Sequence, residues 1–94
     1  MNIFDLIWRP PVVEKLIRKH RLLPQEVEQV FRGNPHFRFI ESGDVRGEDL
    51  YAALGRTDSG RYVIAFFVRK RDGSALIISA RDMDAKERRA YAKK

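Results

Sequence analysis

The chain has 94 residues and carries 19 Lys and Arg against 13 Asp and Glu, which gives a formal net charge of +6. This length suits one domain, residues 1–94, and leaves no room for a second hydrophobic core, so a multidomain enzyme is excluded. The excess of cations favours a polyanionic or acidic partner. Because the sequence contains no Cys, disulfides, thiolate nucleophiles and Cys-based metal sites are excluded.

The first third of the chain predicts one strand and two helices. The run Ile3–Trp8 is rich in strand-forming residues and stops before Pro10. Apolar residues at helical spacing predict an amphipathic helix over 11–20. Pro24 stands at the first position of a second helix, which Gly33 ends.

Beyond the second helix the apolar period changes to that of strands. Alternation predicts strands over 37–41, 49–56 and 61–70, of which the Phe37-Arg38-Phe39 segment is a candidate edge strand. The turn signal Asp72-Gly73 joins the third of these strands to Ala75–Ala80. The unbroken apolar run Ala75–Ala80 indicates burial on both faces in the middle of the sheet.

Asp84 followed by Glu87 is typical of a helix start and predicts a last helix from Ala85 to about Lys93. The elements together predict a small α+β fold, in which a twisted, mainly antiparallel sheet carries two N-terminal helices on one face and a short C-terminal helix alongside. Four residues are predicted to mark the core: Trp8, Phe31, Phe66 and Ile78.

Neither a membrane segment nor a cofactor motif is visible. The longest apolar stretch, Tyr62–Val68, has seven residues, and the first residues lack the basic and apolar regions of a signal peptide, so we expect a cytoplasmic protein with no membrane partner. The sequence has no phosphate-binding glycine loop and no HExxH, and its two histidines, His20 and His36, lie far apart. We therefore expect no metal and no other cofactor.

The cations form the main chemical signal. Arg69, Lys70 and Arg71 end a predicted strand, Arg81 follows the next strand, and Arg88 lies on the last helix. Around the Asp72-Gly73 turn, the first three lie at the hairpin tip and Arg81 at the opposite end, so the two sets need not form one patch. Taken singly they are typical solvated surface charges, whereas as a set they indicate a phosphate-tracking, RNA-binding surface.

Three further side chains have two interpretations each. His20 lies on the apolar stripe of the first helix, which indicates packing, yet the helix end also presents its imidazole beside Lys19, where it could move a proton near neutral pH. Glu48 precedes a strand and is a candidate base or a residue that orients an arginine. Tyr91 is either a packing residue or a hydroxyl that reaches a phosphate.

The residues that carry a family resemblance run through nearly the whole chain. They are Trp8, Lys19-His20, Val27 to Phe31, Gly55, Gly60 to Ile64, Ile77-Ile78-Ser79-Ala80-Arg81, Glu87-Arg88 and Tyr91. The most specific part is Ile-Ser-Ala-Arg followed by Glu-Arg and then Tyr. In this order they resemble the BrnT family of toxins, which look like RelE-type ribonucleases.

The resemblance implies a RelE-like toxin domain of a type II toxin–antitoxin system. It implies metal-independent endoribonuclease activity that inhibits translation and is neutralised by a cognate antitoxin. Lys19 and His20 match the family's Lys-His pair, and Arg81 matches the arginine after Ile-Ser-Ala, so these three are the implied catalytic residues. We expect a one-to-one complex or a two-to-two heterotetramer with an acidic antitoxin, and consider a homodimer in its absence.

Several positions depart from the family pattern. Val12 and Leu16 stand where the family commonly has lysine and asparagine, Leu50 and Leu76 where it often has arginines, and Arg21 where it has glycine. Missing cations leave an alternative function open: a catalytically inactive RelE-like module that binds an antitoxin-like protein or nucleic acid.

Overall fold

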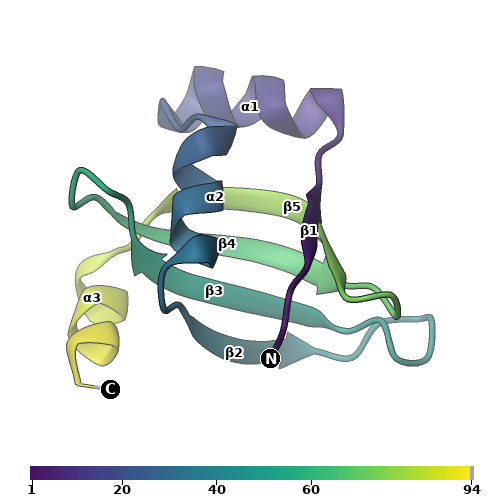
Figure 1. Ribbon diagram of the computed structural model, residues 1–94. Coiled ribbons are helices and arrows are strands. Elements are labelled where there is room, and N and C mark those ends of the chain that lie inside the picture. The colour runs from purple at the N-terminus through teal and green to yellow at the C-terminus, as the bar shows by residue number, and fades with distance from the viewer. Residues whose placement is uncertain (94) are drawn as a thin grey trace.

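Within residues 1–93, the part of the chain that the computed structural model describes, five strands form one sheet with three helices around it (Figure 1). In chain order the elements are β1 (Asp5–Ile7), α1 (Pro10–His20), α2 (Pro24–Arg32), β2 (His36–Glu41), β3 (Leu50–Arg56), β4 (Tyr62–Arg69), β5 (Ser74–Asp82) and α3 (Ala85–Ala92). The strand order is β1-β5-β4-β3-β2; β1 runs parallel to β5, and the other pairs are antiparallel. The predicted α+β fold is confirmed.

Prolines and caps decide where the first two helices begin and end. Pro10 and Pro24 occupy the first helical positions, where the missing N–H costs no hydrogen bond. Helix α1 ends because Arg21 adopts the left-handed conformation with φ 51°, and the N–H of Leu22 then bonds to the carbonyl of Leu16 at 3.1 Å. Both helices therefore lie within a residue or so of their predicted bounds.

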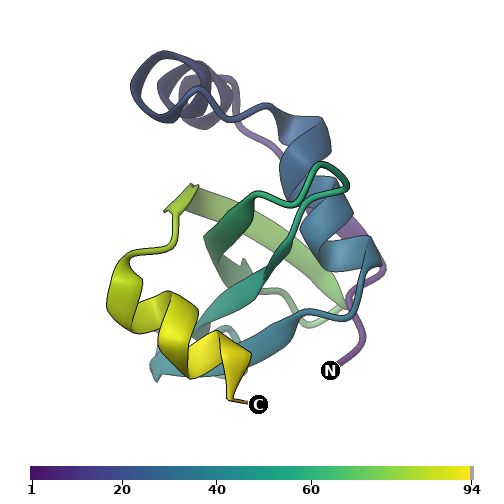
Figure 2. The same ribbon diagram turned by 90° about the vertical axis from the view of Figure 1, so that its left-hand side faces the viewer.

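Helices α1 and α2 lie on one face of the sheet and enclose the larger core (Figure 2). Leu16, Leu22 and Val27 are fully buried there together with Phe67 of β4. Phe31 of α2 meets the Phe67 ring edge-on with centroids 5.2 Å apart. Removal of these side chains from water is the main force that holds the helices on the sheet.

The opposite side of the sheet, called the open face below, is covered at one end by α3 (Figure 2). There Leu54, Ile64 and Met83 are buried, and Tyr91 of α3 packs against them. Farther along this face, three half-buried residues stand in register on neighbouring strands: Leu50, Val68 and Leu76.

Strand β5 lies between β1 and β4, so the predicted position inside the sheet is confirmed, but the predicted burial on both of its faces is wrong at Ile78. Ile77 pairs with Phe67 and Ser79 with Phe66, so Ile78 is an extra residue without a partner on β4, which is a β-bulge. Its side chain is 43% exposed. An unbroken apolar run conceals such a bulge, because the run contains no alternation that the extra residue could interrupt.

The other predicted core markers lie at the margin of the packing. Trp8, Phe31 and Phe66 are half-buried, whereas smaller residues such as Leu16 and Val27 fill the centre. The first strand is also shorter than expected, because only Asp5–Ile7 pairs with β5. Apolar size alone thus overstated how deep the aromatic residues lie.

Candidate functional site

The two ends of the sheet have different surroundings. At the α3 end, where β4 begins and β5 stops, the C-terminal end of α1 and helix α3 both lie close by (Figure 1). At the turn end, the β4–β5 turn lies beside the loop that precedes β3 (Figure 1). Arg81 pairs with Ile64, and β4 spans roughly 17 Å from Ile64 to Arg69 at about 3.4 Å per residue.

Arg61 connects three segments at the α3 end. Its Nε and Nη2 donate to Asp82 Oδ1 and Oδ2 at 2.6 and 3.2 Å. Its two Nη atoms donate to the carbonyls of His20 and Arg21 at 2.7 and 2.9 Å. A longer contact of 3.4 Å reaches Glu26 of α2. One guanidinium thereby ties the last turn of α1 to the end of β5.

The ion pair between Arg61 and Asp82 keeps both groups charged. The hydrogen bond from Arg61 holds the pKa of the Asp82 carboxyl below its usual value, and the charges of Arg61 and His20 act in the same direction. The bond to Asp82 correspondingly raises the pKa of Arg61. Asp82 is therefore a fixed anion close to His20, in a surrounding that is otherwise rich in cations.

Arg81 projects from β5 onto the open face. Its Nη1 and Nη2 donate to the two carboxylate oxygens of Glu87 at 2.8 and 2.9 Å, and Nη1 also contacts the carbonyl of Asp82 at 3.2 Å. The guanidinium lies 5.6 Å from the centre of the Phe66 ring. The hydrogen bonds to Glu87 raise the pKa of Arg81 and also fix the orientation of its guanidinium.

Two further arginines stack on Tyr62, the first residue of β4. The guanidinium carbons of Arg56 and Arg88 lie 4.8 and 4.2 Å from the centre of its ring. Tyr91 meets the same ring edge-on with centroids 6.1 Å apart. Both arginines are exposed, so each keeps donors for an external ligand while the ring orients it.

A hollow of about 310 Å³ opens between these groups, and its wall includes Arg61, Asp82 and Arg88 together with Gly60, Tyr62 and Met83. Its lining residues belong to the start of β4 and the residues before it, to the end of β5 and the residue after it, and to helix α3. Figure 2 views the molecule from this end of the sheet. Guanidinium groups on its wall suit an anionic oxygen, since their planar forks bind two oxygens at once.

Lys19 and His20 lie at this α3 end on α1, whereas Arg81 projects from the open face on the other side of the sheet, so the structure does not bring them into contact. The Lys19 side chain is exposed and forms no hydrogen bond or ion pair within residues 1–93. His20 is half-buried, and its carbonyl rather than its ring is held by Arg61. A half-buried side chain at a helix end still reaches solvent.

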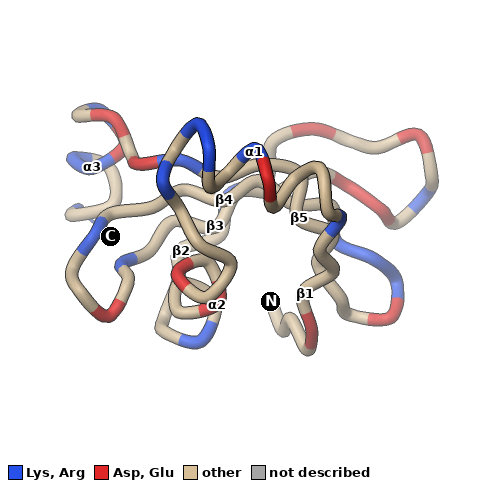
Figure 3. The backbone as a smooth tube through the Cα atoms, turned by 90° about the horizontal axis from the view of Figure 1, so that it is seen from above, with Lys and Arg blue, Asp and Glu red and all other residues tan. Residues whose placement is uncertain are grey.

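The other predicted cations form a second group at the turn end, and Figure 3 shows charged residues at both ends of the molecule. Lys70 Nζ is bonded to Glu48 Oε1 at 2.8 Å, and Arg71 is held by the carbonyl of Arg46 at 2.7 and 3.0 Å. Arg69 is half-buried at the end of β4. Glu48 orients a lysine here, far along the sheet from Arg81.

Several residues of the α3 end were not expected as site residues from the sequence. Arg61, Asp82 and Glu87 form its ion pairs, and Arg56 with Tyr62 forms its stacking group. Glu87 had a local signal, because its spacing from Asp84 predicted a helix cap, and Arg61, Tyr62 and Glu87 stand among the residues that carry the family resemblance. The pairing of Arg61 with Asp82 joins positions 21 residues apart and depends on the hairpin register.

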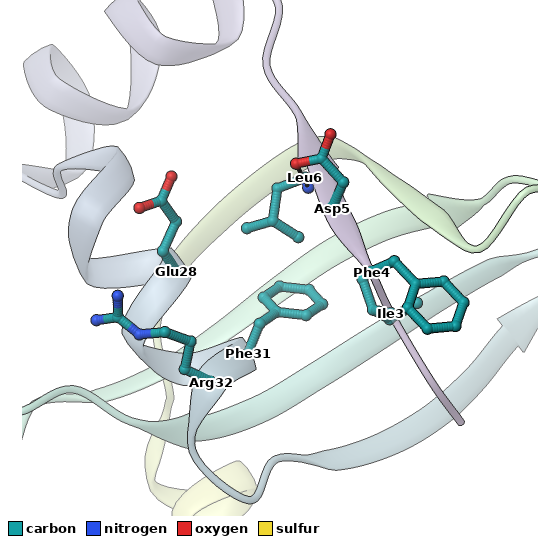
Figure 4. A pocket seen from close by; sticks show the side chains of 7 residues that line it. All are labelled: Ile3, Phe4, Asp5, Leu6, Glu28, Phe31 and Arg32. Atoms are coloured by element: carbon teal, nitrogen blue, oxygen red, sulfur yellow. Dashed lines mark hydrogen bonds between the residues drawn. The ribbon is translucent and has the colours of Figure 1, made fainter.

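A groove distant from these groups lies between β1 and α2 (Figure 4). Its volume is about 270 Å³, and it is lined by Ile3, Leu6 and Phe31, with Asp5, Glu28 and Arg32 beside them. Phe4, which also borders it, is 78% exposed. The floor of the groove is apolar, and the charged residues on its wall form no catalytic cluster. The groove therefore suits contact with another chain.

The fold and the site together define a small α+β protein that holds oriented arginine side chains at one end of its sheet. Its sequence matches the family model for the ribonuclease toxin BrnT of type II toxin–antitoxin systems over residues 8–87. The chain therefore belongs to the BrnT family, and the resemblance inferred from its motifs is confirmed. Membership implies a ribonuclease toxin with an antitoxin partner.

No curated protein in the collection that was searched matches the chain. Among residues 1–93, no group of three or more His, Cys, Asp or Glu side chains is arranged to hold a metal ion. None of the helices in that range combines the length and apolar character needed to cross a membrane.

Proposed function

We propose that this chain is a cytoplasmic endoribonuclease that cuts RNA without a metal ion and is neutralised by a cognate antitoxin. The observation that carries the proposal is the gathering of Arg61, Arg81 and Arg88 at the end of the sheet where α1 also presents Lys19 and His20. Cleavage at a ribose 2′-hydroxyl needs a proton acceptor, a proton donor and cations around the phosphorus, and these residue types supply all three.

Each residue has a definite role in this proposal. His20 accepts the proton of the 2′-hydroxyl, whose oxygen attacks the phosphorus and forms a 2′,3′-cyclic phosphate. Lys19 donates a proton to the departing 5′-oxygen. Arg81 stabilises the charge of the phosphorane with the donors that Glu87 leaves free, and Arg88 holds a neighbouring phosphate. Tyr91 supports Tyr62 and brings its hydroxyl toward the same phosphate.

The turn end has a supporting role. Arg69, Lys70 and Arg71 follow the RNA backbone beyond the cleavage site, and Glu48 orients Lys70 for this contact. Because the two ends lie roughly 17 Å apart along β4, an RNA that touches both must extend across several nucleotides. The open face between them provides the path.

The antitoxin has a fitting surface on β2, the edge of the sheet opposite β1. The edge backbone of β2 is free to pair, and Phe39 and Ile40 are 54% and 38% exposed. We propose an acidic antitoxin that adds to this edge in a one-to-one or two-to-two complex. Light scattering on the purified toxin, alone and with its antitoxin, measures the assembly directly.

Cleavage in the presence of a chelator tests the catalytic proposal. The purified chain with excess EDTA should cut a long single-stranded RNA and leave 2′,3′-cyclic phosphate and 5′-hydroxyl ends. A matching RNA with 2′-O-methyl groups should stay intact, because it lacks the nucleophile. A folded protein that leaves the unmodified RNA intact under these conditions refutes the enzymatic function.

One observation favours a second candidate, the binding module without catalysis. Leu50 and Leu76, which stand where the family often has arginines, flank Val68 on the open face, so an apolar row occupies the path proposed for RNA. Leu16, in place of the family's asparagine, is fully buried in the core. The apolar row suits a protein segment better than a phosphate chain.

Salt dependence separates the two candidates. Binding to phosphates weakens steeply as salt concentration rises, because condensed counterions are released. RNA that is bound in a salt-dependent way and then cut supports the ribonuclease. Binding of an antitoxin-like protein that ignores salt, together with intact RNA, supports the binding module.

A further inference from the structure

The Arg81 guanidinium is held by one carboxylate on a neighbouring helix. We infer that Glu87 is a positioning residue, which fixes the Arg81 fork so that its remaining donors meet a phosphate of the RNA; the inference rests on the proposed ribonuclease function. Neither the motif of the resemblance nor the family model assigns Glu87 a role in this chain.

Arg81 uses three of its five N–H donors within the described residues. Two bind the Glu87 carboxylate, and the second hydrogen of Nη1 contacts the Asp82 carbonyl. The Nε–H and one hydrogen of Nη2 have no acceptor within residues 1–93. These two donors lie side by side on one edge of the guanidinium, which is the geometry that binds two phosphate oxygens.

Glu87 is fixed as firmly as the arginine it holds. Its Oε1 accepts from Arg81 Nη1 and also from the backbone N–H of Asp84 at 2.9 Å, and the N–H of Glu87 donates to Asp84 Oδ1 at 2.8 Å. The side chain is 14% exposed. Because the cap closes the first turn of α3, the carboxylate cannot turn away from Arg81 without opening the helix start.

Two other roles for Glu87, as a proton acceptor and as a substitute for the substrate phosphate, fit the structure less well. The hydrogen bond from Arg81 lowers its pKa, and Arg38 acts in the same direction from β2, so the carboxylate is a poor proton acceptor near neutral pH. A carboxylate that merely occupied the place of the substrate phosphate would engage the donors that a phosphate needs. Glu87 instead binds the end of the fork and leaves its side edge open.

The decisive variant is Glu87→Gln. Its amide oxygen can still accept from the Asp84 N–H, so the cap is kept, but its NH2 group opposes the Arg81 donors and the fork is released. Asp84→Ala is the matched control, because it removes the cap acceptor and leaves the Arg81 to Glu87 bonds in place. Thermal melting of both variants shows how much each one destabilises the fold.

Cleavage kinetics of the full chain distinguish positioning from a structural role. We expect Glu87→Gln to lower kcat roughly tenfold to hundredfold, because a misplaced charge stabilises the transition state poorly. KM should stay equal or fall, since one negative charge near the RNA is lost. Asp84→Ala should keep kcat within about threefold of the wild type even at a similar loss of Tm.

Magnetic resonance supplies a readout that does not need turnover. The Arg81 Nε–H should give a sharp signal in the wild type that shifts when 2′-O-methyl RNA is added, and that signal should be lost or broadened in Glu87→Gln. An unchanged or higher kcat in folded Glu87→Gln overturns the inference while the ribonuclease function stands. If the wild type cuts no RNA, the proposed function fails, and an Arg81 signal that ignores the RNA overturns the inference as well.

Discussion

Arg61 binds both carboxylate oxygens of Asp82, and the same guanidinium holds the carbonyl at the last residue of α1. The pair therefore fixes the position of the C-terminal end of α1 relative to β5. It also keeps a negative charge close to His20. The same ion pair thus holds α1 in place and sets the charge beside His20.

The Asp82 carboxylate should make the stability depend on pH in the acid range. Its pKa is lowered by folding, so its stabilising contribution is complete above the usual pKa of an aspartate, about 4, and is lost as pH falls through the lower folded value. Asp82→Asn should be less stable near pH 7 by under about 1 kcal/mol, since the group is largely exposed. Urea unfolding between about pH 3 and pH 7 should show the two proteins converging at the acid end.

Loss of the proposed catalytic groups should lower cleavage sharply. We expect His20→Ala and Arg81→Ala each to lower kcat/KM about a hundredfold, the scale seen for proton-transfer and charge-stabilising groups. The measurement is the initial rate on a labelled RNA with EDTA present.

Matched surface variants control for the loss of charge. Lys15→Ala on α1 and Arg32→Ala on α2 each remove an exposed cation outside the site and should change the rate less than about threefold. Full activity in both His20→Ala and Arg81→Ala would show that the site lies elsewhere.

The turn end should affect binding more than chemistry. Replacement of Arg69, Lys70 and Arg71 by alanine should weaken the binding of 2′-O-methyl RNA and reduce the slope of log affinity against log salt by about 1 to 2, at about 0.7 for each lost phosphate contact. Fluorescence anisotropy over a salt series measures this slope. An unchanged slope would place the RNA on another surface.

The loss of unfolding free energy on substitution of an apolar residue should follow the burial of that residue and not its hydrophobicity. Leu16→Ala should cost about 2 to 5 kcal/mol of unfolding free energy, because Leu16 is fully buried between α1 and the sheet. Ile78→Ala should cost under about 1 kcal/mol, since the bulged side chain is partly in water. Equal losses in urea unfolding would contradict the packing described for β5.

Local patterns in the sequence were sufficient for most of the fold. Helices start at Pro10 and Pro24 because proline suits a first helical position, and the spacing of Asp84 and Glu87 identified the start of α3. The bulge at Ile78 could not be predicted, because it appears only when β5 is paired with β4. The parallel pairing of β1 is likewise a property of the assembled sheet.

The candidate site was only partly visible for the same reason. The separation of Arg81 from the Arg69 to Arg71 group was predicted, because one turn signal placed them at opposite ends of a hairpin. The partners that orient the cations could not be predicted, because Arg61 meets Asp82 and Arg88 meets Tyr62 only through tertiary contacts. The roles of Lys19, His20 and Arg81 remain predictions that the activity measurements will decide.

The bulge in β5 has a further consequence for Arg81. Side chains alternate between the two sides of a strand, so one inserted residue reverses the alternation for everything that follows. Leu76 and Arg81 are five positions apart and would lie on opposite sides of a regular strand, yet both lie on the open face, because Leu76 pairs with Val68 and Arg81 with Ile64. Regular pairing of the same strand without the bulge would turn the Arg81 guanidinium toward α1 and α2. In this protein the side of the sheet on which a cation lies therefore depends on one unpaired residue upstream, and pairing through Ile78 without the bulge would move the charge to the helix-covered side without altering the arginine.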